Sequence, residues 1–242
     1  KAEGFYFNEV LNTNSNSPIS LYALAELSNA STVNVNMLST LEVSRVEYLL
    51  SQGITFNNAK HQAQQEILNI FFIKKPTIAE SELLNISVDG DDNAILLAIS
   101  LILQGYRQPG DLVQLMGNIS TDIRTDGILN STTLGSALIN DVVLLDTVQI
   151  RSNIENKYIS LGVTTVIPHF EKYIKQFLDS NTYSFTNYVT FPSSGTYGVN
   201  LLNTTDSVFV QGFNYSFSAD LPEGTHLKVN HNGNLGSLGY VA

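Results

Sequence analysis

The chain of 242 residues contains no cysteine. This absence excludes a disulfide framework, a zinc site built on thiolates and a cysteine nucleophile. The redox compartment stays open, since many exported bacterial proteins also lack cysteine. A fold of this length buries roughly 70 to 75% of its extended surface, so it can fold without disulfides or bound metals.

Positive charge and long hydrophobic runs are also scarce. Only 12 Lys and Arg stand against 22 Asp and Glu, and the net charge is -10. Affinity for phosphates depends on basic side chains, so we expect no nucleic-acid partner. The longest charge-free apolar run, residues 94–103, is about half of what a bilayer crossing requires, so we expect no transmembrane segment in this chain. The segment after Lys1 lacks the pattern of a signal peptide, and the chain looks like a mature form or a fragment.

Hydrophobic residues, in contrast, make up 43% of the chain and charged residues only 14%, which predicts a packed structure. Residues 1–22 contain two short β-type runs, GFYFNEVL and ISLYAL, which we interpret as the C-terminal strands of a preceding β domain. Beyond residue 28 the hydrophobic period changes from two to about 3.6. We therefore expect an α-helical bundle domain over residues 23–180.

About seven helices with short loops are expected in that bundle. Gly53 is the predicted end of the first helix and Thr55 the predicted N-cap of the second. The apolar stripes that predict the helices contain Leu38, Leu41, Val46, Leu49 and Leu50; Phe56, Ala59, Ala63, Ile67, Ile70 and Phe71; the run 94–103; Leu112, Leu115, Met116, Ile119 and Ile123; Leu134, Leu138, Val142 and Leu145; Ile150, Ile154, Tyr158 and Leu161; and Phe170, Tyr173, Ile174 and Phe177.

Period-two alternation returns in residues 181–242, with turn signals every 8 to 12 residues. This pattern is typical of an antiparallel Ig-like β-sandwich. The expected fold class is therefore a mainly α-helical bundle followed by an antiparallel Ig-like sandwich, with a short N-terminal β segment.

The stretch DGDDNAILLAISLILQG, residues 89–105, has two competing interpretations. Asp89, Asp91 and Asn93 alternate like the first ligands of a calcium loop, and they are the only candidate metal ligands. The sixth and twelfth positions of such a loop are Ala94 and Ser100, however, where glycine and a bidentate carboxylate are required. We therefore favour a capping role for Asp91 or Asp92 at the start of a helix that is apolar on nearly all sides, with Ser100 as its main exception.

Other candidate sites carry weaker signals. The histidines His61, His169, His226 and His231 are scattered, without the HExxH spacing of a zinc site. Acids such as Glu80 and Glu82 would suit general acid-base chemistry, but nothing in the sequence sets their separation. We therefore predict no catalytic residues and no cofactor.

The phrases AEGFYFNEV, ISLYAL, RVEYL, QAQQEILNIF and GDDNAILLAIS together carry a resemblance that extends over most of the chain. The chain resembles exported multi-domain surface proteins and lipoproteins of Gram-negative bacteria. In these, a carboxypeptidase-regulatory-like β domain precedes a helical domain of unassigned function. The resemblance implies an extracellular or cell-surface location on the outer-membrane or periplasmic side, and it supplies no catalytic residues to transfer.

Three functions from different classes stay open. The leading hypothesis is a non-catalytic structural, adhesive or scaffold module of an exported surface protein, with a protein or glycan as its cell-surface partner. The alternative is a glycan-binding protein that uses aromatic side chains of the predicted sandwich, because rings stack on sugars and amides pair with hydroxyls. The third is a carboxylate-dependent hydrolase with Glu80, Asp91 or Asp92 in a cleft of the bundle.

Overall fold

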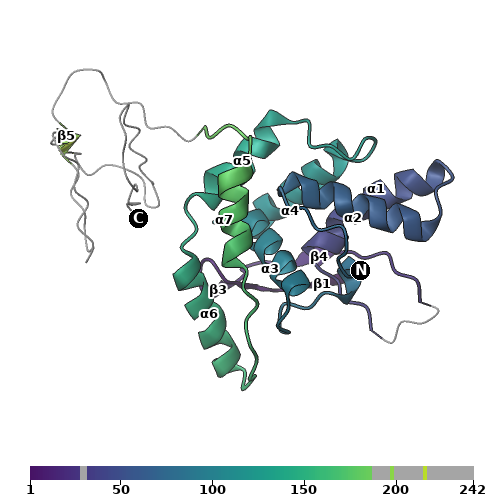
Figure 1. Ribbon diagram of the computed structural model, residues 1–242. Coiled ribbons are helices and arrows are strands. Elements are labelled where there is room, and N and C mark those ends of the chain that lie inside the picture. The colour runs from purple at the N-terminus through teal and green to yellow at the C-terminus, as the bar shows by residue number, and fades with distance from the viewer. Residues whose placement is uncertain (28–31, 187–196, 199–214, 217–242) are drawn as a thin grey trace. The chain divides into compact units, whose positions relative to one another are not determined.

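The computed structural model describes residues 1–27, 32–186, 197–198 and 215–216. The chain divides into two compact units, Lys1–Ser184 and Phe185–Ala242. Seven α-helices lie in the described part of the first unit (Figure 1). They are α1 (Met37–Ser51), α2 (Phe56–Ile70), α3 (Asp91–Gln104), α4 (Pro109–Asp122), α5 (Thr132–Val142), α6 (Thr147–Ser160) and α7 (Glu171–Ser180), with the 3-10 turn η1 (Ser81–Leu83) between α2 and α3. No single helix in these described ranges is long and apolar enough to cross a membrane; only the pair α5 and α6, bent by 75°, meets that test together.

Helix α3 is the central element of the first unit. It contacts α1, α4, α5 and α7, and ten of its residues, all after Asn93, are buried. Ser100 is the only residue after Asn93 in this helix that is not fully buried. The prediction of a core helix with apolar side chains on nearly every face is confirmed, because a helix of that composition must be covered all round.

Helices α1 and α2 form an antiparallel pair joined by a short loop. The side chain of Asn36 accepts a hydrogen bond from the backbone N–H of Ser39, and the Ser39 hydroxyl accepts one from the N–H of Asn36. This reciprocal capping box satisfies backbone donors that helix formation leaves free. The predicted stop at Gly53 and the predicted start after Thr55 are confirmed, and Gly53 has φ +85°, which suits a residue without Cβ.

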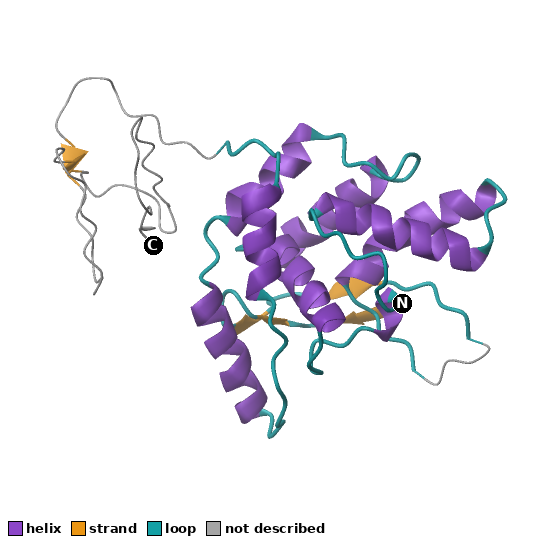
Figure 2. Ribbon diagram, viewed as in Figure 1, coloured by secondary structure: helices purple, strands orange, loops and turns teal. Residues whose placement is uncertain are grey.

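The N-terminal residues form two small antiparallel ladders within the same compact unit as the helices (Figure 2). Strand β1 (Ala2–Gly4) pairs with β4 (Ile19–Leu21), and β2 (Phe7–Asn8) pairs with β3 (Thr13–Asn14). Strand β4 also contacts α1 and α4. Because β4 lies against the helices, the N-terminal ladders can form one wall of a cavity whose other wall is helical. That this segment completes a preceding β domain stays a prediction.

The predicted antiparallel Ig-like β-sandwich over residues 181–242 is wrong. The described residues there form a single two-residue ladder, β5 (Tyr197–Gly198) with β6 (Tyr215–Ser216), and it is parallel. Most of the predicted strands lie outside the described residues. Alternation of apolar and polar residues marks a surface suited to a strand, but a sandwich also requires several strands to pair in one register, which local alternation does not specify.

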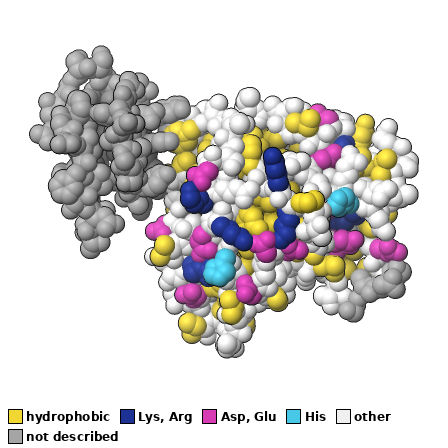
Figure 3. All heavy atoms as spheres, in the orientation of Figure 1, with side chains coloured by type: hydrophobic (Ala, Val, Ile, Leu, Met, Phe, Trp, Pro, Cys, Tyr) yellow, Lys and Arg dark blue, Asp and Glu magenta, His cyan; other side chains and the backbone are white. Residues whose placement is uncertain are grey.

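Ion pairs between elements hold the first unit together. Arg45 of α1 binds Glu66 of α2 through two hydrogen bonds of 2.6 and 2.8 Å and also donates to the carbonyls of Arg124 and Thr125. On the face shown in Figure 3, basic side chains lie beside acidic ones rather than gathering in a patch of one sign. Among the described residues, four cations form bridges between two helices: Arg45, Lys60, Arg151 and Lys172.

Candidate functional site

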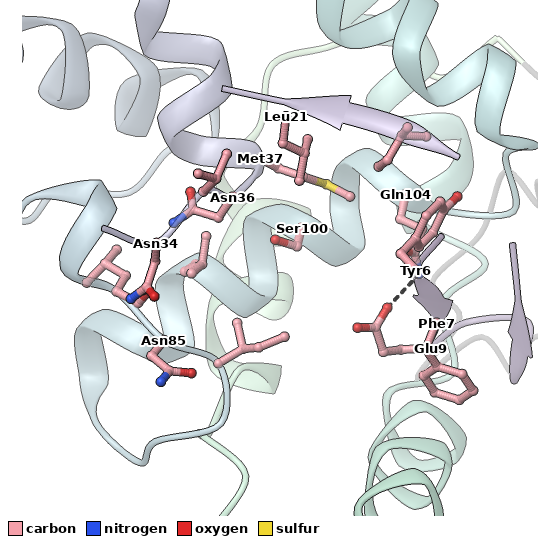
Figure 4. Close-up of a pocket in the computed structure, with 15 residues that line it drawn as sticks. Tyr6, Phe7, Glu9, Leu21, Asn34, Asn36, Met37, Asn85, Ser100 and Gln104 are labelled. Carbon is pink, nitrogen blue, oxygen red and sulfur yellow. Dashed lines mark hydrogen bonds between the residues drawn. The ribbon is translucent and has the colours of Figure 1, made fainter. Parts of the chain in front are cut away.

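A partly open cavity of about 310 Å³ lies between the N-terminal strands and helices α1 and α3. It is lined by Tyr6, Phe7, Glu9, Ile19, Leu21, Asn34, Val35, Asn36, Met37, Leu84, Asn85, Ile86, Leu96, Ser100 and Gln104. In the close-up of Figure 4, Glu9, Tyr6 and Gln104 stand on one side, the three asparagines stand on the other, and Ser100 lies between them. Apolar walls with a few convergent polar groups are the usual composition of a ligand site.

The Glu9 side of the pocket is held in place by amide groups. The buried Gln104 amide donates to Oδ1 of Asn8 and to Oε2 of Glu9, each over 3.0 Å. Asn153 of α6 donates to the backbone carbonyl of Glu9 over 2.8 Å. The segment after β2 is therefore tied to both α3 and α6, and the carboxyl group of Glu9 has a defined position in the pocket wall.

Glu9 is the acidic residue among those that line this pocket, and it is partly buried. Burial raises the pKa of its carboxyl group, and its hydrogen bonds, including the one from Gln104, oppose this rise only in part. Within the described residues Glu9 forms no salt bridge. Burial and the nearby Glu9 raise the pKa values of Tyr6 and Tyr158 as well, which keeps both phenols neutral at neutral pH. The pocket thus contains one carboxyl group without a counter-ion.

The opposite side of the pocket presents amide groups with spare hydrogen-bonding capacity. Asn34 donates to the carbonyl of Leu84 over 3.0 Å, and Asn36, while capping α1, donates to the carbonyl of Ser81 over 2.7 Å. Within the described chain, Oδ1 of Asn34, Nδ2 of Asn85 and the hydroxyl of Ser100 have no hydrogen-bond partner. A ligand in the pocket can therefore reach both a donor and an acceptor there.

A buried ion cluster lies behind the turn that carries this wall. Lys60 of α2 binds Glu42 of α1 at 2.6 Å and Glu82 of η1 at 2.7 Å, and the Ser81 hydroxyl donates to Glu42. The side chains of the three charged residues are only 1 to 4% exposed. No substrate can reach such a sealed cluster, so we assign it the structural role of fixing η1 against α1 and α2. Periodicity placed these helices correctly but carried no signal for the cluster.

The carboxylate oxygens of Asp91, a candidate metal ligand at the start of α3, bind cationic and hydroxyl groups of the protein itself. Asp91 binds Lys75, Lys172 and the Tyr173 hydroxyl, the last over 2.8 Å. Lys172 and Lys75 lower the pKa of Asp91 well below its ordinary range. Two ammonium groups at this carboxylate oppose the binding of a metal cation.

The other two candidate ligands, Asp89 and Asn93, are used in local hydrogen bonds. Asp89 accepts from the N–H of Gly90, and Asn93 accepts from the N–H of Asn85 and donates to the carbonyl of Val88. Among the residues that the structure describes, no three His, Asp or Glu side chains are grouped as metal ligands would be. The Asp91 cluster instead joins α3 to α7.

The predicted capping role of Asp91 or Asp92 is also wrong. Gly90 is the N-cap of α3, with φ +139° and no side chain to bond the free N–H groups. Asp91 and Asp92 occupy the first turn, as the helix dipole favours, but they bind Lys75, and Asp92 accepts from the N–H of Ala79. The lysine attracts both carboxylates away from the helix end, which no local pattern reveals.

The acids of the hydrolase hypothesis have different surroundings. Burial and the neighbouring Glu82 raise the pKa of Glu80, whereas lysines lower the pKa of Asp91. Asp91 is therefore held as a carboxylate and is unsuited to donate a proton as a general acid. Neither Glu80, Asp91 nor Asp92 lines the pocket. The sequence analysis predicted none of the pocket residues as site residues. The polarity of Ser100 on an otherwise apolar helix was the one usable signal.

Comparisons with protein-family models, with curated proteins and with solved structures found no match. The resemblance to exported surface proteins therefore stays an expectation. The pocket is the structural feature that bears on the class of function.

Proposed function

We propose that the helical unit is a non-catalytic binding module and that the pocket between the N-terminal strands and α3 is its binding site. The main support for this proposal is that Glu9, Ser100 and the asparagines converge on one cavity with apolar walls. The volume, about 310 Å³, suits a small molecule or a single side chain of a partner. In line with the resemblance, we place this module on an exported bacterial surface protein.

The titratable groups of the pocket favour binding over chemistry. Its lining residues include one carboxyl group, Glu9, and one phenol, Tyr6, whose pKa is raised. Glycoside hydrolysis ordinarily uses two carboxyl groups on opposite sides of the scissile bond, and an activated serine needs an adjacent base. No histidine or lysine lines the pocket beside Ser100, so we assign Ser100 the role of a hydrogen-bonding group rather than of a nucleophile.

A fragment screen against the whole chain, read by thermal shift, tests this proposal. We expect fragments that stabilise the protein and lose their effect in Ser100→Phe, whose ring fills the centre of the pocket. The control is Gln114→Phe, which places the same ring on the exposed side of α4. If Ser100→Phe unfolds, the smaller Ser100→Leu replaces it. Hits that bind Ser100→Phe and Ser100→Leu as well as the parent protein would refute the pocket as the site.

A further inference from the structure

We propose that the pocket selects a small organic cation, with its ammonium group against the Glu9 carboxylate and its apolar body against the walls formed by Leu21, Met37 and Leu96. The inference deepens the proposed function and rests on it. It names the charge and the chemical class of the ligand.

The charge of the pocket lining is complementary to a cation. The pocket is lined by one carboxyl group and by no lysine, arginine or histidine. An anionic ligand, such as a phosphate or a carboxylate, would find no cation among these lining residues and would be repelled by Glu9. An ammonium group, in contrast, would supply the counter-charge that Glu9 lacks, and the net charge of -10 attracts cations to the protein as a whole.

Three other acids of the first unit, two buried and one partly buried, are paired with cations. Glu42 and Glu82 both bind Lys60, and Glu66 binds Arg45. Glu9 accepts from the neutral amide of Gln104, without any ion pair to the described residues. A partly buried carboxyl group with little access to water is most stable as a neutral acid or as a paired ion, so the pocket offers a position for either a proton or a cation.

The rest of the pocket wall suits an organic cation in its shape and polarity. Tyr6 lies on the same side of the pocket as Glu9, where its ring offers a face to a cation (Figure 4). The free amide and hydroxyl groups of Asn34, Asn85 and Ser100 lie away from Glu9 and suit a neutral polar group at the other end of the ligand. The class that fits is a short alkyl amine, with or without a hydroxyl or amide group at its far end.

Binding of such an amine is coupled to a proton. At pH values where Glu9 holds its proton, the acid releases it to solution on binding, and the resulting carboxylate pairs with the ammonium group; no covalent bond forms. Tyr6 and Tyr158 are the titratable groups whose pKa responds to Glu9, and both stay neutral. Affinity for the amine should therefore rise with pH as Glu9 loses its proton, until the amine itself is deprotonated.

The test is calorimetry on the whole chain with three probes of nearly equal size: n-butylammonium, 1-butanol and butyrate. We expect n-butylammonium to bind and 1-butanol and butyrate not to bind. Release of the Glu9 proton should make the measured heat of binding depend on the buffer. Glu9→Gln should weaken this binding at least tenfold, whereas Glu155→Gln, which removes an exposed acid from α6, should leave it unchanged. Circular dichroism checks that Glu9→Gln is folded. The comparison of the three probes on the parent protein tests the inference without any variant.

The outcomes separate the inference from the proposed function. Equal binding of 1-butanol and n-butylammonium, or no effect of Glu9→Gln in a folded protein, would overturn the cation and leave a neutral ligand in the same pocket. The proposed function would then still stand if Ser100→Phe abolished that binding. No binding of any probe, together with an empty fragment screen, would overturn both.

Discussion

Glu9 makes the stability of the protein depend on pH. Its raised pKa means that the native state holds the proton more tightly than the unfolded chain does. The native state is therefore favoured below the ordinary pKa of glutamate and loses that advantage as the pH rises through the native-state pKa. We expect Glu9→Gln, which keeps the acceptor for Gln104 but cannot ionise, to be more stable than the parent protein at high pH.

The expected gain is roughly 1–3 kcal/mol at about pH 8, in the range for a buried polar group that lacks a full partner. At about pH 3 the two proteins should have similar stability, because Glu9 is then largely protonated in both the native and the unfolded state. Urea unfolding at the two pH values measures this difference. Parallel loss of stability with pH in both proteins would show that Glu9 is not the group responsible.

Gly127 is a second position where a single residue decides stability. Its φ is +75°, and a Cβ there would lie 2.2 Å from the carboxyl carbon of Glu66, which binds Arg45. Gly127→Ala should therefore displace a partly buried ion pair and cost about 3 kcal/mol or more.

Gly53 is the matched control, since it has φ +85° but open space where its Cβ would lie. Gly53→Ala should cost only the backbone term of about 1–2 kcal/mol. Both costs are measured by urea unfolding. Equal costs for the two variants would mean that the contact with Glu66 is relieved by a small movement of its side chain.

At the scale of elements, the Lys60 cluster joins α1, α2 and η1 and so supports the asparagine wall of the pocket. Lys60→Met leaves Glu42 and Glu82 buried without a cation and should cost about 3–5 kcal/mol. Adding Glu42→Gln and Glu82→Gln removes the stranded charges and should recover part of that loss. Chemical denaturation of the single and triple variants measures this, and a triple variant less stable than Lys60→Met would contradict it.

Some helix ends could be predicted from the local sequence and others could not. Helix positions such as the end at Gly53 and the start after Thr55 were predictable, because apolar periodicity and capping act over a few residues. The cap of α3 was not, since Lys75 and Lys172, which are distant in the chain, bind the acids that local pattern assigned to capping. Contacts between distant elements therefore determine how the acidic side chains at the start of α3 are bound.

At the scale of the whole molecule, the pocket could not be read from the sequence. Its walls come from residues 6–9, 19–21, 34–37, 84–86 and 96–104, which only the folded chain brings together. The predicted sandwich failed for a related reason, because alternation identifies surfaces suited to strands without specifying their pairing. The uncompensated carboxyl group of Glu9 is likewise a property of the assembled pocket.

Titration of the Glu9 carboxyl group is the most direct test of the proposed cation site. The measurement is the carbon NMR signal of the Glu9 side chain followed against pH, with and without saturating n-butylammonium, and assigned with Glu9→Gln. We predict a midpoint above the ordinary pKa of glutamate in the free protein and a fall of that midpoint when the amine is bound. A midpoint at the ordinary value under both conditions would contradict this prediction.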